Sequence, residues 1–219
     1  MQLKQKLTFT AVLLVLVVVL GVLSVREYDS RKELVFCEET DRVALTVDGR
    51  ELTLGDLAFY IAYQEQTIEA EALIYNPENT NEYWNLYTNH TFLRDAGKQA
   101  VIEMAVHDEI FYQMAVAEGI VLSREEEAHL ANDRYDFWSD LEEDGRAALG
   151  ISEEELGESM RKVALAEKYQ ALFAQMQQKD FEEYSFTGEA YARLLEEHTY
   201  TLDENVWERV PFGSVTVRH

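Results

Sequence analysis

The chain has 219 residues, of which 47% are hydrophobic and 11% aromatic, so it can bury a core and is not typical of a disordered protein. Its 42 acidic residues outnumber its 19 basic residues, which gives a formal net charge of −23. This charge argues against nucleic-acid binding, because that binding depends on neutralising phosphates with Lys and Arg. Two interpretations remain: an acidic surface that serves solubility, or an electrostatic preference for basic protein partners.

The chain begins with a short basic segment and an uncharged apolar run at residues 7–25. A helix rises about 1.5 Å per residue, so this run is long enough to cross the core of a bilayer. We therefore expect a cytoplasmic tail at residues 1–6, a transmembrane anchor at residues 7–25 and a polar tether at residues 26–42. Cleavage near Val22-Leu23-Ser24 is the alternative to an uncleaved anchor. Cys37 is the only cysteine, so no disulfide can form within the chain.

A β-hairpin followed by a capped helix is predicted at Val43–Ile61. Asp48-Gly49 between alternating residues favours a tight turn, because both turn positions need positive φ. Thr53-Leu54-Gly55-Asp56 has the spacing of a capping box, so a helix should begin there. The same helix should run to about Tyr75, because Asn76-Pro77 ends it.

Most of the remaining chain is predicted to be helical. A loop rich in Tyr and Trp is expected first, at Asn76–His90. The expected helices then run over about Phe92–Glu118, Ser123–Glu143, Ser152–Gln178 and Glu189–Glu197, from apolar spacing and capping boxes. The tail alternates polar and apolar residues at Thr199–Leu202 and Ser214–Val217. These two segments are predicted to be strands that pair with the N-terminal hairpin and close the two ends into one domain.

Two stretches in this order carry a resemblance to a known family. They are VALTVDGRELTLGDL, behind a membrane-length segment, and HTFLRDAGKQAVIEMAVHDEIFYQMAVAEGIVLSREEE, behind the Tyr/Trp loop. Together they resemble the N-terminal chaperone domain of the SurA/PrsA foldases over about Val43–Gln178. The resemblance implies a mainly α fold, in which an N-terminal transmembrane helix precedes a SurA-N-like helical domain at residues 43–219. A small β-sheet would be formed by the two ends of that domain, which includes a C-terminal helix and strand segment.

The resemblance also implies a function and a location. It implies a single-pass protein of the bacterial cell membrane whose main domain lies outside the cytoplasm and holds unfolded or newly translocated proteins without ATP. Only about 40 residues follow Gln178, too few for the parvulin peptidyl-prolyl isomerase domain of full foldases. We therefore expect a protein that is not an enzyme, although isomerase is the activity that the family label suggests. The alternative is a non-catalytic scaffold that binds one partner in a cell-envelope complex.

The sequence offers no motif for a catalytic site, a metal or a cofactor. GxSxG, HExxH, P-loop and GxGxxG patterns are absent, so no catalytic residue, metal ligand or cofactor is expected. His107-Asp108-Glu109 is the most suggestive cluster of titratable residues. Adjacent residues on a helix point in different directions, so these three are expected to diverge on a helix surface.

The candidate peptide-binding residues are aromatic instead. A surface that binds many unfolded segments needs exposed and adaptable apolar side chains. The alternative for each candidate is that its side chain only packs the helices against one another and binds no peptide. The candidates are Tyr60, Tyr63, Tyr83, Trp84, Tyr87, Tyr135, Phe137 and Trp138.

Overall fold

The computed structural model describes residues 32–218, and this part of the chain is mainly helical with two small antiparallel sheets. The helices are α2 (Leu54–Tyr75), α3 (Asn81–Trp84), α4 (Leu93–Ala117), α5 (Arg124–Asp140), α6 (Glu143–Leu149), α7 (Glu153–Met176), α8 (Glu189–Leu195) and α9 (Glu204–Trp207). The strands are β1 (Val43–Val47), β2 (Arg50–Thr53), β3 (Tyr87–Thr88), β4 (Thr91–Phe92) and β5 (Tyr200–Leu202). Two short 3₁₀ helices are η1 (Phe36–Glu38) and η2 (Phe181–Tyr184).

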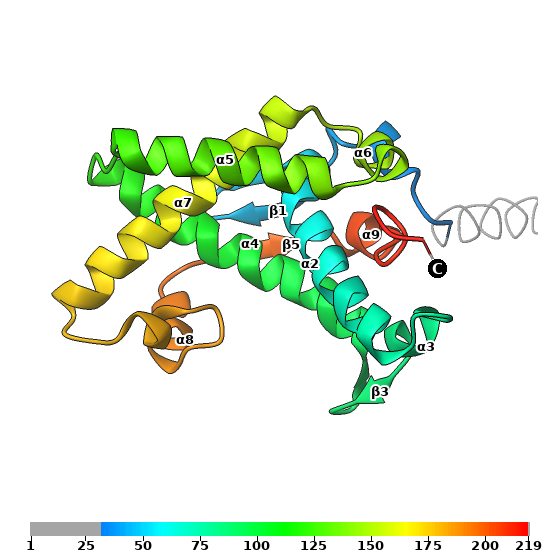
Figure 1. Ribbon diagram of the computed structural model, residues 1–219. Helices are drawn as coiled ribbons and strands as arrows, with labels where there is room; N and C mark the ends of the chain where they lie inside the picture. The colour runs from blue at the N-terminus through cyan, green and yellow to red at the C-terminus, as the bar shows by residue number, and fades with distance from the viewer. Residues whose placement is uncertain (1–31, 219) are drawn as a thin grey trace, which may run out of the picture.

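The larger sheet joins the two ends of the domain (Figure 1). Its strand order is β2-β1-β5, and Leu45 of β1 lies opposite Leu52 on one side and Leu202 on the other. In the turn between β1 and β2, Asp48 and Gly49 adopt φ values of 48° and 82°. These positive values are the ones that an Asp-Gly turn favours. The expected hairpin and the expected return of residues 199–202 to it are both confirmed.

Side-chain caps fix where three long helices begin. Thr53, Ser123 and Ser152 each accept a hydrogen bond from the backbone N–H three residues later, and the acidic residue there completes a capping box. Helices α2, α5 and α7 therefore begin as predicted. The helix that was expected to reach about Glu143 ends at Asp140, however, and the short helix α6, which was not predicted, begins at Glu143; Leu141 between them is buried.

The segment before β1 is packed against the domain. Leu34 and Phe36 are only 5% and 4% exposed and belong to the hydrophobic core. Cys37 is exposed with a free thiol, and its backbone meets Gly150 so closely that a Cβ on Gly150 would lie 2.5 Å from the Cα of Cys37. The prediction of a free tether at residues 26–42 is therefore wrong for its packed part, because Leu34 and Phe36 supply apolar anchors.

The expected membrane anchor at residues 7–25 and the cytoplasmic tail at residues 1–6 lie outside the described residues. Within residues 32–218, no helix is both long enough and apolar enough to cross a membrane.

The expected loop at residues 76–90 contains structure of its own. Helix α3 forms inside it, and β3 pairs with β4 in a second, two-stranded hairpin. Asn89 and His90 form the turn of this hairpin with φ values of 49° and 68°. Asn tolerates positive φ better than most residues, so this turn also has a local cause.

Only one of the two strands predicted in the tail forms, and that strand is β5. The segment Ser214–Val217 is irregular, because a buried carboxylate binds the backbone N–H groups that a strand would use. Glu65 Oε1 accepts hydrogen bonds from the N–H groups of Gly213 at 2.6 Å and Val215 at 3.1 Å, and its Oε2 accepts one from Thr216 at 2.6 Å. Glu65 is itself fully buried, so it fixes the tail on α2.

Helix α4 lies at the centre of the domain. It packs against α7, α2 and β1, and α5 covers α7 from the other side (Figure 1). Because neighbours surround the middle of α4, every residue of Ala105–Phe111 is buried. The expected surface position of His107-Asp108-Glu109 is therefore wrong: the three residues are 5%, 9% and 3% exposed.

Candidate functional site

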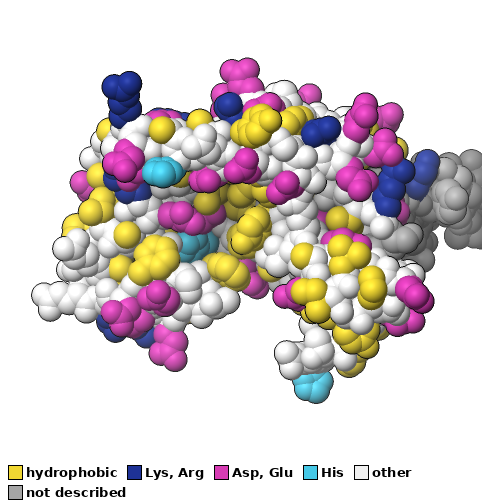
Figure 2. All heavy atoms as spheres, viewed as in Figure 1, with side chains coloured by type: hydrophobic (Ala, Val, Ile, Leu, Met, Phe, Trp, Pro, Cys, Tyr) yellow, Lys and Arg dark blue, Asp and Glu magenta, His cyan; other side chains and the backbone are white. Residues whose placement is uncertain are grey.

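An open groove lies between α2, α4, α7 and the segment that follows η2. Figure 2 shows it as a hollow with hydrophobic side chains around it and carboxylate and His atoms at its back. The pocket at its centre has a volume of about 280 Å³. The apolar walls of this pocket are Phe59, Tyr63, Met104, Val163, Phe181 and Phe186. We call this pocket and its walls the groove.

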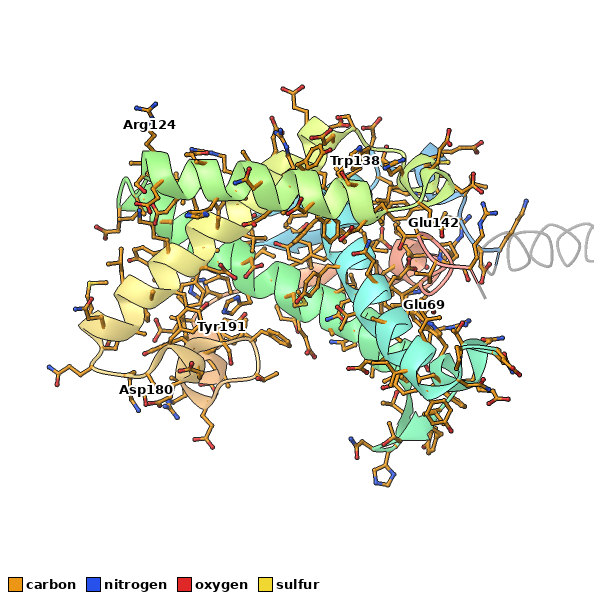
Figure 3. The ribbon with its side chains drawn as sticks, in the orientation of Figure 1. Glu69, Arg124, Trp138, Glu142, Asp180 and Tyr191 are labelled. Carbon is orange, nitrogen blue, oxygen red and sulfur yellow. The ribbon has the colours of Figure 1, made fainter. Side chains whose placement is uncertain are left out.

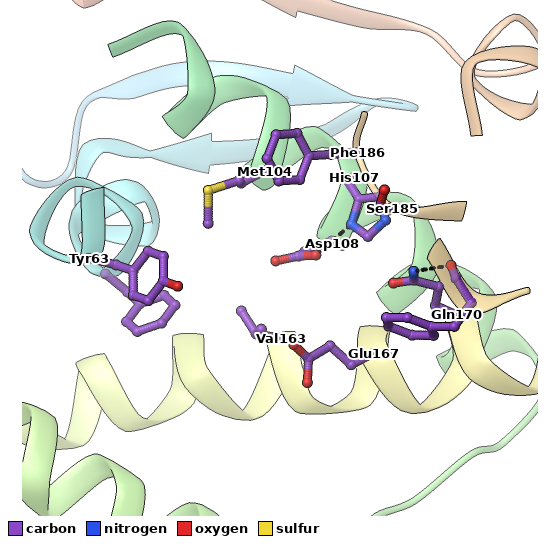
Figure 4. A pocket seen from close by; sticks show the side chains of 11 residues that line it. Tyr63, Met104, His107, Asp108, Val163, Glu167, Gln170, Ser185 and Phe186 are labelled. Atoms are coloured by element: carbon purple, nitrogen blue, oxygen red, sulfur yellow. Dashed lines mark hydrogen bonds and ion pairs between the residues drawn. The ribbon is translucent and has the colours of Figure 1, made fainter. Parts of the chain in front are cut away.

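Asp108 lies at the middle of the groove, next to His107 (Figure 4). His107 Nδ1 is 2.7 Å from Asp108 Oδ1, and His107 Nε2 is 2.9 Å from the carbonyl oxygen of Tyr184. A carbonyl oxygen only accepts, so Nε2 must carry a hydrogen. Nδ1 also faces an acceptor oxygen, so one further proton is held between the imidazole and the carboxyl group. The pair is therefore neutral as a whole, whichever partner holds that proton.

Glu109 does not join this pair. Its carboxylate lies 3.2 Å from Arg50 Nε on β2 and accepts a hydrogen bond from Gln113 at 3.0 Å. The expected divergence of the cluster thus holds for Glu109, while His107 and Asp108 do meet. Burial raises the pKa of Glu109, and the nearby Arg50 charge opposes that rise.

Tyr60 supports Asp108 from inside the core. Its side chain is 5% exposed, and its hydroxyl is close enough to the Asp108 carboxylate for that charge to act on it. Burial, followed by the negative charge of Asp108, raises the pKa of Tyr60 well above its usual value. Tyr60 therefore remains a neutral hydrogen-bond donor throughout the physiological pH range.

Glu167 is the second carboxyl group of the groove, and it comes from α7 (Figure 4). Within residues 32–218 it has no hydrogen-bond or ion-pair partner. The residue is exposed on one side, but its neighbours remove part of the water from its carboxyl group. This desolvation, with the charge of Asp108 next, raises the pKa of Glu167, while His107 opposes the rise.

Polar side chains hold the far wall of the groove in place. Gln170 Nε2 donates to the carbonyl oxygen of Phe181 at 3.1 Å, and His107 binds the carbonyl oxygen of Tyr184. These contacts attach η2 to both α7 and α4. The described residues 32–218 contain no group of three His, Cys, Asp or Glu side chains placed to hold a metal ion.

The groove continues along the other side of α7. A second, larger hollow of about 590 Å³ lies between α5 and α7, and it shares Glu167 and Phe181 with the first pocket. Leu122, Leu130 and Leu172 contribute apolar surface to it. The two hollows together form an extended open surface, which suits a chain segment better than a compact small molecule.

Three of the predicted aromatic residues lie at or behind the groove. Tyr63 is 44% exposed and lines it directly. Phe137 of α5 is half-buried, with its ring centre 5.3 Å from that of Phe59. Tyr60 is buried in the core close to Asp108 and does not line the groove, so its predicted contact with a ligand is wrong.

The other five candidates lie elsewhere. Trp84 is fully buried, donates from Nε1 to Glu69 at 2.7 Å and packs edge-on against Phe212, so it is part of the core and cannot bind a peptide. Tyr83 is half-buried and bound to Glu71, while Tyr87 is 62% exposed on β3.

The two remaining candidates belong to α5. Tyr135 is 65% exposed. Trp138 is half-buried at the end of α5 near α6 (Figure 3). Arg146 donates to its carbonyl oxygen at 3.0 Å and lies over its ring. The sequence therefore identified one directly lining aromatic, Tyr63, and did not identify Phe59, Phe181 or Phe186 as members of the same site.

The groove is thus defined by geometry and chemistry alone. No family model matches the chain, and no curated protein or solved structure gives a significant match to it.

Proposed function

We propose that the protein is a chaperone that holds unfolded or newly translocated proteins without ATP, by binding their apolar segments in the groove. The observation that supports this proposal is the open groove with aromatic and Met walls on an otherwise well-packed domain. Aromatic and Met side chains adapt to many apolar sequences, which a receptor for diverse unfolded chains requires. The SurA-N-like character of the domain is part of the same proposal, and it rests on the sequence resemblance.

The proposed setting is the outer face of a bacterial cell membrane. The uncharged run at residues 7–25 would anchor the protein, and the described domain would lie outside the cytoplasm. A membrane anchor would keep such a domain close to chains that emerge from translocation. This placement rests on the sequence, because the run lies outside the described residues.

The first test measures whether the groove suppresses aggregation. Tyr63 and Phe181 are 44% and 42% exposed, so the double variant Tyr63→Ser/Phe181→Ser removes groove surface with little effect on the core. We expect the full chain to suppress light scattering of a chemically denatured client at near-stoichiometric ratio. The double variant should need about tenfold more protein for the same effect, which corresponds to about 1.4 kcal/mol of lost binding.

The matched control is Tyr87→Ser/Tyr135→Ser, which removes two exposed aromatics at 62% and 65% exposure from outside the groove. It should behave like the wild type. Equal loss in both double variants would show that the groove is not the binding surface. No suppression for several clients, at low and moderate salt, would overturn the chaperone proposal. A single stoichiometric partner after crosslinking in cells would support the scaffold alternative.

A further inference from the structure

The groove carries an unbalanced negative charge between apolar walls. In the pocket between α2, α4 and α7, the lining residues within residues 32–218 that can carry a charge near neutral pH are His107, Asp108 and Glu167, with no Lys or Arg among them. His107 and Asp108 share one proton and compensate each other, as their hydrogen-bond geometry requires. Glu167 has no such partner within residues 32–218.

The lysine of the continuing hollow does not correct this imbalance. Lys168 donates to Glu126 at 2.7 Å and to the carbonyl oxygen of Val121 at 3.0 Å. Its charge is therefore already paired on the side of α5. An apolar pocket with one uncompensated carboxylate is electrostatically complementary to one cation.

We propose that the groove selects client segments in which an Arg or Lys is flanked by apolar residues, with Glu167 pairing with the cationic side chain. This inference rests on the proposed chaperone function and names the class of segment that the groove binds. The long alkyl stem of Arg or Lys can lie along apolar walls while its charged end reaches a carboxylate. Tyr63 and Phe59 add aromatic faces beside the pocket, and such faces favour cations, Arg in particular.

The composition of the chain is consistent with this selection. A protein with a net charge of −23 attracts basic segments at long range. That general attraction is screened within about 10 Å at 0.1 M salt, whereas a partly desolvated pair in the groove is screened much less. The pair with Glu167 should therefore contribute specificity that persists at moderate salt.

The test uses three fluorescent peptides that are identical and apolar except for Arg, Gln or Glu at the central position. At 0.15 M salt, the full wild-type chain should bind the Arg peptide about tenfold more tightly than the Gln peptide, and the Glu peptide least tightly. In Glu167→Gln, the preference for Arg over Gln, measured as the ratio of the two affinities, should fall to about twofold or less. Glu154→Gln is the matched control, because Glu154 is an exposed carboxylate of α7 outside the groove.

Each contrary result identifies what fails. If the wild type binds the Gln peptide and Arg adds nothing, the cation selectivity is wrong while the chaperone proposal stands. If Glu167→Gln keeps the full Arg preference, or Glu154→Gln loses as much of it, the preference comes from the overall charge and the assignment to Glu167 is wrong. If the wild type binds none of the three peptides, both proposals fail.

Discussion

Lys98 occupies a setting that disfavours its positive charge. Its Nζ donates to the carbonyl oxygens of Glu208 at 3.1 Å and Val210 at 2.9 Å and lies 5.5 Å from the ring centre of Trp207. Burial lowers the pKa of Lys98 from 10.5 to about 8, although Asp95 and Glu208 oppose this change. The side chain joins α4 to the segment around α9, so its charge state affects how firmly that segment is held.

The lowered pKa of Lys98 predicts a rise in stability at alkaline pH. Between pH 8 and pH 10.5 Lys98 binds more protons in the unfolded state than in the folded state, so its contribution to the free energy of unfolding increases with pH in that window. From pH 7 to pH 9.5 the Lys98 contribution should be on the order of 1–2 kcal/mol. Urea denaturation of the wild type and Lys98→Met at both pH values measures it, because Met keeps the alkyl stem without a titrating group.

Lys179→Met is the control for Lys98→Met, since Lys179 is a surface lysine paired with Glu183. The gain in stability between pH 7 and pH 9.5 should be retained in Lys179→Met and largely absent in Lys98→Met. An equal gain in both variants would show that other groups cause the pH dependence.

At the scale of elements, the capping box of α7 supports both the core and the groove. Ser152 Oγ accepts from the backbone N–H of Glu155 at 3.2 Å, and the Glu155 carboxylate accepts from the backbone N–H of Ser152 at 2.7 Å. Helix α7 packs along α4 and carries Val163, Glu167 and Gln170 into the groove. The cap therefore fixes the start of the helix that bears much of the site.

Ser152→Ala should destabilise the domain by about 1 kcal/mol, because it leaves a helix N-terminal N–H without its side-chain acceptor. Ser139→Ala is the control, since Ser139 is exposed in the last turn of α5 and Ala is a good helix former. Its free energy of unfolding should stay within about 0.5 kcal/mol of the wild type. If the urea-unfolding midpoint of Ser152→Ala equals that of Ser139→Ala, the capping box adds no stability.

Local sequence signals predict an element well where the whole motif, such as a capping box or a turn dipeptide, is present in the sequence. The box at Thr53 and the Asn76-Pro77 end predicted α2 correctly, and Asp48-Gly49 predicted the hairpin. Interactions between distant residues were not predictable in this way. The strand expected at Ser214–Val217 does not form, because Glu65, far away in the sequence, binds the backbone N–H groups of this segment.

The candidate site likewise contains some residues that the sequence predicts and others whose positions depend on contacts between distant parts of the chain. Tyr63 was predicted because an aromatic on an amphipathic helix is a visible candidate, and it does line the groove. Phe181 and Phe186 follow α7 in a segment with little periodicity, so nothing in the sequence placed them opposite Tyr63. His107 and Asp108 were expected at the surface because an amphipathic helix usually has a solvent face, which the middle of α4 lacks.

At the scale of the whole molecule, the two ends of the described chain meet on one side of the domain. Leu34 donates its backbone N–H to Arg209 O at 2.8 Å, and Arg209 Nε donates to Lys32 O at 2.8 Å. Strand β5 pairs with β1 beside these contacts. The tail beyond them is held by Glu65 of α2, the same helix that presents Tyr63 to the groove. Helix α2 thus connects the closure of the domain to the candidate site.

Glu65→Leu should strongly destabilise the protein, because Glu65 holds the C-terminal tail on α2. It leaves the buried N–H groups of Gly213, Val215 and Thr216 without the acceptor that they share, at a cost of about 3 kcal/mol or more. Amide hydrogen exchange of residues 213–216 should become much faster, while exchange in the middle of α4 changes only with global stability. Glu65→Gln retains one carbonyl acceptor, so its loss of stability should be intermediate.

Glu71→Leu is the matched control for Glu65→Leu, because it makes the same change on the same helix at an exposed position. Glu71 accepts a hydrogen bond from Tyr83 at the surface, so its loss should cost less than about 1 kcal/mol. Unchanged exchange at residues 213–216 in both Glu65 variants would mean that the tail is held without the carboxylate. If exchange there becomes faster in Glu65→Gln while this variant still binds peptides in the groove, closure of the two chain ends is not required for binding.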